Sequence, residues 1–152
     1  MRVRQDIYEQ LLSAPAVPPE AGGILGSSRQ GILDTICWDP GVPFTRQNGR
    51  YVPDITFFNS VIVQWNTAGI RFSGIFHTHL PQWDGLSHGD RQYIVRILES
   101  MPPSVCFLYF PIVFPGQAVR PYLASRRTDG LVHSIQKDTL IVVKGDITHE
   151  KT

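Results

Sequence analysis

Cysteine is scarce in the 152-residue sequence, and neither charge dominates it. The two cysteines, Cys37 and Cys106, lie in separate apolar stretches, TICW and SVCFLYF. This placement favours buried thiols over a disulfide or a metal-binding pair. Net charge is +1, with 14 basic residues scattered along the chain. Electrostatics therefore give no reason to expect nucleic acid or an anionic membrane as a partner.

Long apolar runs and internal repeats are also missing. No run approaches the roughly 18 residues that span a bilayer. The N-terminal MRVRQDIYEQLL is charged and amphipathic, unlike a secretory signal. With 42% hydrophobic residues, the chain suits one compact domain. We predict this domain at residues 1–145, followed by a short polar tail at 146–152, in a cytoplasmic protein.

The hydrophobic pattern predicts an α+β fold with a central mixed β-sheet flanked by helices. Helical spacing of Ile7, Leu11 and Leu12 predicts a first helix over residues 4–13. The segments GGILGS (22–27) and GILDTICW (31–38) predict a β-hairpin. Three prolines and two glycines make residues 39–54 the expected long loop. A second helix is expected from Asn59, as its cap, to Ala68, with Gly69 as its stop.

Alternation over residues 70–79 predicts a strand. One face would carry Ile70, Phe72, Phe76 and Thr78, and the other Arg71, Ser73, Ile75, His77 and His79. A helix is expected over residues 87–100. Further strands are expected within 104–114, 119–124 and 131–143, interrupted by proline and glycine.

The stretch FHTHLPQWDGLSHGD (76–90) carries the strongest chemical signal. Strand alternation sends His77 and His79 to one face, so their imidazoles converge. Asp90 begins the apolar stripe of the next helix and is aimed inward, where an unpaired charge is costly. Two imidazoles and one carboxylate are ligands that zinc prefers, and they leave a fourth position open.

Other interpretations of these residues stay open. Ser87-x-x-Asp90 ahead of an apolar run is also a helix capping box. A lone His-x-His pair is more often structural than metal-binding. Capping and metal binding are compatible, because a serine can cap a helix and still present its hydroxyl to a substrate.

Hydrolysis at such a metal needs a general base as well. Glu20, which follows VPP and opens the strand EAGGILG, is the candidate. The alternative is an exposed residue at the start of a strand. Glu9, Glu99 and Glu150 are weaker candidates by position.

Taken together, these positions resemble the JAMM motif of the JAB/MPN metallopeptidase family. The match comprises Glu20 before GGILG, then His77-Thr78-His79, seven residues, Ser87, two residues and Asp90. The order of elements is similar over nearly the whole chain. Thr78 replaces the serine that is most often found between the two histidines.

The resemblance implies a role for each matched position. His77, His79 and Asp90 would bind one Zn²⁺ ion with a bound catalytic water. Glu20 would deprotonate that water and then protonate the leaving amine. Ser87 would donate a hydrogen bond to the tetrahedral oxyanion, a contact whose loss typically costs about 3 kcal/mol.

The resemblance also implies a substrate class. The leading hypothesis is a zinc-dependent isopeptidase or peptidase cleaving at the C-terminal tail of a ubiquitin-like or sulfur-carrier-like protein. A bacterial antiphage conjugation system is one setting for it. The tail would bind as an added strand. Trp83 would wall its channel or else pack on the core, and the loops at 39–54 and 111–121 would select the substrate.

Two other functions remain open at this stage. One is a metallohydrolase of small amides or peptides in sulfur-carrier metabolism. The other is a non-catalytic MPN interaction module with a structural metal. The sequence leaves the oligomeric state undecided.

Overall fold

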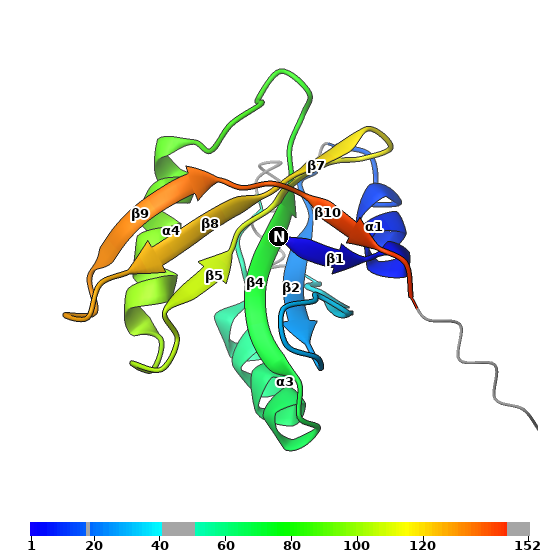
Figure 1. Ribbon diagram of the computed structural model, residues 1–152. Coiled ribbons are helices and arrows are strands. Elements are labelled where there is room, and N and C mark those ends of the chain that lie inside the picture. The colour runs from blue at the N-terminus through cyan, green and yellow to red at the C-terminus, as the bar shows by residue number, and fades with distance from the viewer. Residues whose placement is uncertain (18, 41–50, 146–152) are drawn as a thin grey trace, which may run out of the picture.

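The described part of the chain folds into three α-helices and two β-sheets, as an α+β domain (Figure 1). The computed structural model describes residues 1–17, 19–40 and 51–145. The helices are α1 (Gln5–Leu12), α3 (Ile55–Thr67) and α4 (His88–Ser100). The strands are β1 (Arg2–Arg4), β2 (Gly22–Ser27), β3 (Thr35–Trp38), β4 (Arg71–Thr78), β5 (Phe107–Tyr109), β6 (Ile112–Phe114), β7 (Ala118–Arg120), β8 (Tyr122–Arg126), β9 (Val132–Lys137) and β10 (Ile141–Val143).

The large sheet is mixed, as expected. Its strands run in the order β3-β2-β4-β5-β8-β9, with β6 pairing to the end of β4 and β7 pairing to β6. The β2–β3 hairpin and the β2–β4 pair are antiparallel, whereas β4 pairs in parallel with β5 and β6. A small separate sheet joins β1 to β10 in parallel. Strands β2 and β4 therefore lie side by side inside the large sheet.

Two core clusters occupy opposite faces of this sheet. Helices α3 and α4 cover one face, where Phe58 and Leu98 pack against Ile24 and Ile75. Helix α1 covers the other, where its apolar residues pack against Leu25, Phe76 and Val113. Ile24 and Leu25 are adjacent in β2 yet belong to different clusters, as the two-residue side-chain repeat of a strand requires.

The predicted assignment of side chains to the two faces of the 70–79 strand is wrong at Phe72. The β2–β4 pairing passes from Leu25↔Gly74 to Gly26↔Phe72, so Ser73 is skipped. This β-bulge shifts the side-chain alternation by one residue. Phe72 consequently shares a core cluster with Ile75, while Phe76 belongs to the opposite one. Beyond the bulge the alternation is regular through the histidines.

The second predicted helix begins earlier than expected. Helix α3 starts at Ile55, because Asp54 is its N-cap and accepts a hydrogen bond from the Phe57 N–H. Asn59 lies within the helix instead of capping it. The predicted stop is confirmed, since Gly69 has φ of +76° directly after the helix. A left-handed residue of this kind commonly ends helices.

Two expected segments are divided differently. Residues 111–121 form mostly the β6–β7 hairpin and not a loop, with its turn at Gly116. Residues 131–143 divide between β9 and β10, which belong to different sheets. Of the expected loop at 39–54, residues 41–50 lie outside the described residues, as does the predicted tail at 146–152. No helix in the described part of the chain has the length and apolar composition of a membrane span.

Candidate metal centre

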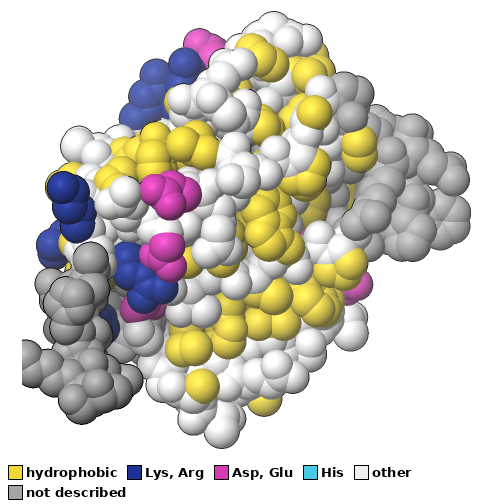
Figure 2. Space-filling model, turned by 90° about the vertical axis from the view of Figure 1, so that its right-hand side faces the viewer, with side chains coloured by type: hydrophobic (Ala, Val, Ile, Leu, Met, Phe, Trp, Pro, Cys, Tyr) yellow, Lys and Arg dark blue, Asp and Glu magenta, His cyan; other side chains and the backbone are white. Residues whose placement is uncertain are grey.

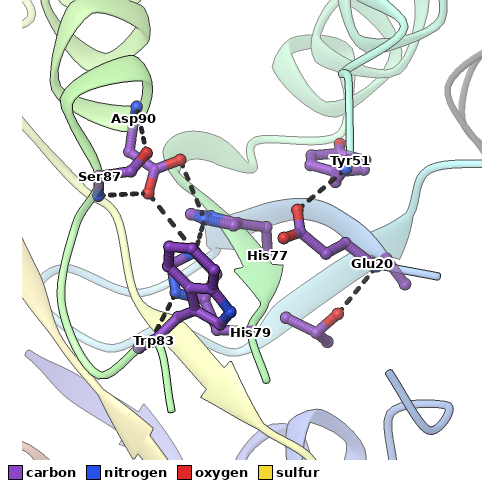
Figure 3. A network of polar contacts seen from close by, with 9 residues as sticks. Glu20, Tyr51, His77, His79, Trp83, Ser87 and Asp90 are labelled. Atoms are coloured by element: carbon purple, nitrogen blue, oxygen red, sulfur yellow. Dashed lines mark hydrogen bonds and ion pairs between the residues drawn. The ribbon is translucent and has the colours of Figure 1, made fainter. Parts of the chain in front are cut away.

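His77 and His79 lie at the end of β4, on one side of the strand. Both are buried, and their Nε2 atoms are 2.7 Å apart. Asp90, in the first turn of α4, is half-buried and faces both rings (Figure 3). Its Oδ1 lies 3.3 Å from His77 Nε2 and its Oδ2 lies 3.4 Å from His79 Nε2. The structure thus brings together the three residues that the sequence singled out as ligands.

This donor set fits a divalent metal ion. Ligand atoms bound at 2.0–2.1 Å to a tetrahedral zinc ion lie about 3.3 Å from one another. The two histidine–aspartate separations match this spacing, and the two imidazole nitrogens are somewhat closer. All three ligand atoms lie within 4.8 Å of one another. Two imidazoles and one carboxylate provide three donors, which leaves room for a fourth ligand.

The surrounding hydrogen bonds orient the histidine His79. Its Nδ1 lies 2.9 Å from the carbonyl oxygen of Trp83, to which it donates when protonated at that atom. This tautomer directs the Nε2 lone pair at the site, as metal-binding histidines require. Arg120 holds the same loop, because its guanidinium donates to the Asp84 carbonyl at 3.0 Å and lies over the Phe114 ring.

Charge and burial act against each other in this site. Burial disfavours ionisation of Asp90, but hydrogen bonds from His77 and His79 outweigh it and hold the pKa of the carboxyl well below its usual range. Burial alone would lower the pKa of His79. Its hydrogen bonds to Asp90 and Trp83 and the negative charges of Asp90 and Glu20 outweigh burial and raise that pKa. A carboxylate-rich environment of this kind attracts a cation.

Ser87 caps helix α4 with its Oγ as an acceptor, and its hydroxyl hydrogen has no acceptor among the described residues. Its Oγ accepts from the Asp90 N–H at 3.0 Å, and the Ser87 N–H donates to Asp90 Oδ2 at 2.8 Å. The predicted capping box is therefore confirmed. The hydrogen bond from the Ser87 N–H also fixes the Asp90 carboxylate in the orientation that faces the histidines. The Asp90 carboxylate can therefore take part in the capping box and still offer an oxygen to a metal ion.

Glu20 precedes β2 and is half-buried. Figure 3 shows its side chain extending toward the histidines, and its Oε2 accepts a hydrogen bond from the Tyr51 N–H at 3.0 Å. Its negative charge contributes to the raised pKa of His79, which places the carboxylate within electrostatic reach of the site. The structure thus brings Glu20 near the three candidate ligand residues, which lie 57 or more residues further along the chain.

Sequence reasoning missed the supporting roles of two residues, Thr78 and Tyr51. The Thr78 hydroxyl accepts from the Ala21 N–H at 2.8 Å, and the Thr78 N–H donates to the Ala21 carbonyl. Thr78 therefore ties the segment that bears Glu20 to the strand that bears the histidines. Tyr51 also went unnoticed, because a single tyrosine after a proline- and glycine-rich segment gives no periodic signal. The signal for Thr78 was present in its position between the two histidines.

Two sequence expectations about individual side chains are corrected. Cys106 is exposed and not buried, because it precedes β5 at the surface, whereas Cys37 is partly buried. Both cysteines are free, as expected. The Trp83 indole is 59% exposed, so it does not pack on the core. Its proposed place beside a substrate channel stays a prediction.

A small apolar cavity adjoins the site. Its volume is about 200 Å³, and it is lined by Ala16, Val17, His79, Pro81, Phe114, Pro115 and Gln117. The β6–β7 hairpin thus forms part of its wall. Figure 2 shows apolar side chains gathered on the right-hand side of the molecule as drawn in Figure 1, where α1 and this hairpin lie.

Comparisons with known proteins establish the fold but no family. No family model and no curated relative matches the chain. The solution structure of protein DSY2949 from Desulfitobacterium hafniense is similar over 97% of this chain and 96% of that one, with 17% identity and a TM-score of 0.68. A solution structure from Salinibacter ruber covers 94% and 92%, with 16% identity and a TM-score of 0.49. At this identity the first similarity shows the fold alone.

Proposed function

We propose that this protein is a zinc-dependent isopeptidase or peptidase of the JAB/MPN type. The observation that carries the proposal is the convergence of His77, His79 and Asp90, with the Glu20 carboxylate directed toward the histidines and within electrostatic reach of His79. All five positions of the motif are filled, including Ser87. A purely structural zinc has little need for a nearby base or an open position.

Each residue has a role in the proposed reaction. His77, His79 and Asp90 would hold a zinc ion, which when bound acts as a Lewis acid and lowers the pKa of water to about 7. Glu20 accepts a proton from the attacking water and passes it to the leaving amine. Ser87 donates its free hydroxyl hydrogen to the oxyanion that forms at the substrate carbonyl.

We infer that the substrate is the C-terminal tail of a ubiquitin-like or sulfur-carrier-like protein. An extended tail would cross the site next to the β6–β7 hairpin and place one apolar side chain in the cavity beside His79. The lining of that cavity contains no charged group apart from the titratable His79. The two free thiols favour a reducing, cytoplasmic setting, such as an antiphage conjugation system or sulfur-carrier metabolism.

A second candidate function is hydrolysis of small amides or peptides. The cavity is compatible with it, because about 200 Å³ is below the usual range of 300–1,000 Å³ for drug-sized ligands and holds one side chain of a small substrate as readily as one of an extended tail. Such a site suits a single side chain. The chemistry and the metal centre are the same in both candidates, so only the substrate distinguishes them.

The test uses one preparation of zinc-loaded protein and two substrate types. One is a ubiquitin-fold protein with a C-terminal peptide extension, and the other is a set of dipeptides and amino-acid amides. We expect cleavage at the end of the ubiquitin-fold domain, loss of that cleavage in EDTA, and recovery when zinc is restored. We expect Glu20→Gln to reduce kcat by at least about 10²-fold, because the general base is lost.

His88→Ala is the matched control, since His88 is exposed on α4 and outside the ligand set. It is expected to cleave like the wild type. Cleavage confined to the small substrates would favour the second candidate. Cleavage that survives both EDTA and Glu20→Gln would contradict the proposed mechanism, and absence of all cleavage would favour a non-catalytic interaction module.

A further inference from the structure

Tyr51 makes three contacts at once, two of them with residues of the candidate site. Its N–H donates to Glu20 Oε2 at 3.0 Å. Its ring is nearly parallel to the His77 imidazole, with an interplanar angle of 15° and 6.4 Å between centroids. Its hydroxyl donates to Asp39 Oδ2 at 2.7 Å. One residue thus links the proposed base, a proposed metal ligand and a buried carboxylate (Figure 3).

The Tyr51 ring occupies its position because β2 has a glycine, Gly22, at the point of contact. Gly22 is the register partner of His77 in the β2–β4 pair. A Cβ atom on Gly22 would lie 2.5 Å from Tyr51 Cε1 and 2.6 Å from the Phe76 carbonyl oxygen, which no folded structure tolerates without movement. The ring therefore packs directly over the strand backbone, next to the histidine.

Asp39 anchors this arrangement from the other side. It is 7% exposed, and its Oδ2 accepts both the Tyr51 hydroxyl and the Asp54 N–H, the latter at 2.9 Å. Asp54 in turn caps helix α3 through the Phe57 N–H. The segment from Tyr51 to Asp54 is thus fixed to Asp39 at both ends, and the Tyr51 N–H has a defined direction.

We infer that Tyr51, anchored by Asp39, is a positioning residue that holds the Glu20 carboxylate in place for catalysis. This inference rests on the proposed function for its catalytic consequence. A hydrogen bond from the main chain fixes one oxygen of Glu20 and leaves the other free to accept a proton. Misplacing a catalytic group by about 1 Å can cost on the order of 10²-fold in rate.

Four variants separate positioning from a structural effect. Tyr51→Phe removes only the hydroxyl, Asp39→Ala removes its acceptor, and Asp39→Asn keeps an oxygen that can accept from both donors. Tyr8→Phe is the matched control, because Tyr8 lies on α1 and packs against the other core cluster. We expect Tyr51→Phe and Asp39→Ala each to lower kcat about 10- to 100-fold, with KM and zinc affinity changed less than about 3-fold.

The remaining variants are expected to behave differently. Asp39→Asn and Tyr8→Phe keep kcat within about 3-fold of the wild type. The double variant Tyr51→Phe/Asp39→Ala is no slower than Asp39→Ala alone, because both changes remove the same hydrogen bond and their effects are not additive.

A second measurement tests the inference without an activity assay. Hydrogen exchange of the residue 51 amide reports its bond to Glu20, and we expect protection in the wild type that falls about 10-fold or more in both Tyr51→Phe and Glu20→Ala. If the wild type hydrolyses nothing, the proposed function fails and this exchange measurement alone decides the positioning role. Retained protection of this amide in Tyr51→Phe overturns the inference, whether or not kcat falls.

Discussion

Both buried carboxylates of the described residues, Asp34 and Asp39, accept hydrogen bonds from two or more donors. Replacing either one therefore leaves buried donors without an acceptor. Asp39 accepts from Tyr51 and Asp54, and Asp34 accepts from the Ser28 N–H, the Ser28 hydroxyl and the Thr35 hydroxyl. A buried charge persists only where such contacts replace water. Asp34 lies in the β2–β3 connection, outside the candidate metal centre, and so reports stability without involving the site.

Replacing Asp34 with alanine should destabilise the protein in a pH-dependent way. Burial opposes ionisation of Asp34, but the hydrogen bonds from Ser28 and Thr35 outweigh it and hold the pKa of the carboxyl below its usual range. Because the folded-state pKa lies below the unfolded value of about 3.9, the carboxylate stabilises the fold above that pH. The contribution is lost as pH falls through the folded-state pKa.

Urea unfolding at several pH values measures this effect. At pH 7 we expect Asp34→Ala to lower the free energy of unfolding by about 2 kcal/mol, as loss of hydrogen bonds to a charged group typically does. The difference from the wild type should shrink as the pH falls below the unfolded-state pKa of about 3.9. Glu9→Ala, at an exposed position on α1, should stay within about 0.5 kcal/mol. A difference for Asp34→Ala that is constant with pH would contradict this account.

At the scale of single elements, helix α4 is fixed at both ends by side chains. The Ser87–Asp90 capping box begins it. At the other end, the Arg126 guanidinium of β8 donates to the carbonyl oxygens of Leu98, Met101 and Pro102. These are carbonyls at the helix C-terminus and just beyond it, where a positive charge is favourable. Arg126 therefore adds a polar attachment to the apolar packing that holds the helix bearing Asp90 to the sheet.

Arg126→Ala should accordingly loosen α4. We expect the free energy of unfolding to fall by about 2 kcal/mol, because three carbonyls lose a charged donor. Arg127→Ala is the matched control: its ion pair with Asp129 is exposed and should contribute less than about 1 kcal/mol. Chemical denaturation of both variants checks the prediction, and equal losses in the two would contradict it.

The elements of the site were predictable from the sequence, whereas its supporting contacts were not. Strong periodicity located β2, β4 and α4, and motif spacing located the histidines, Asp90 and Glu20. The start of α3 was misplaced because Asp54 follows a proline and precedes an apolar run rich in β-branched residues. The bulge at Ser73 left no local signal, since it arises from pairing with a distant strand.

The contacts of Tyr51 show why spacing alone could not complete the site. Tyr51 and Asp39 flank a proline- and glycine-rich segment. Tyr51 contacts Glu20 and His77, which are 31 and 26 residues away from it in the sequence. Such pairings depend on tertiary packing and have no period in the sequence. The surroundings of Tyr93 likewise depend on tertiary packing. Its buried hydroxyl has no hydrogen-bond partner among the described residues, and nothing in the sequence predicts that.

At the scale of the whole molecule, the site forms where three distant parts of the chain meet. The start of β2, the end of β4 and the start of α4 each supply part of it, and the antiparallel β2–β4 pair brings the first two together. Metal binding should therefore stabilise the entire domain. An ion present at about 1,000 times its Kd adds about 4 kcal/mol to the free energy of unfolding.

Zinc binding to the metal-free protein is the measurement that tests this account most directly. Equilibrium dialysis with metal analysis, together with thermal unfolding, gives stoichiometry and stabilisation in one series. We predict one zinc ion per chain and a higher Tm for the wild type and His88→Ala, with both effects lost in His79→Ala and Asp90→Ala. Zinc that stays bound to His79→Ala and Asp90→Ala, or a wild type that binds none, would contradict the metal centre.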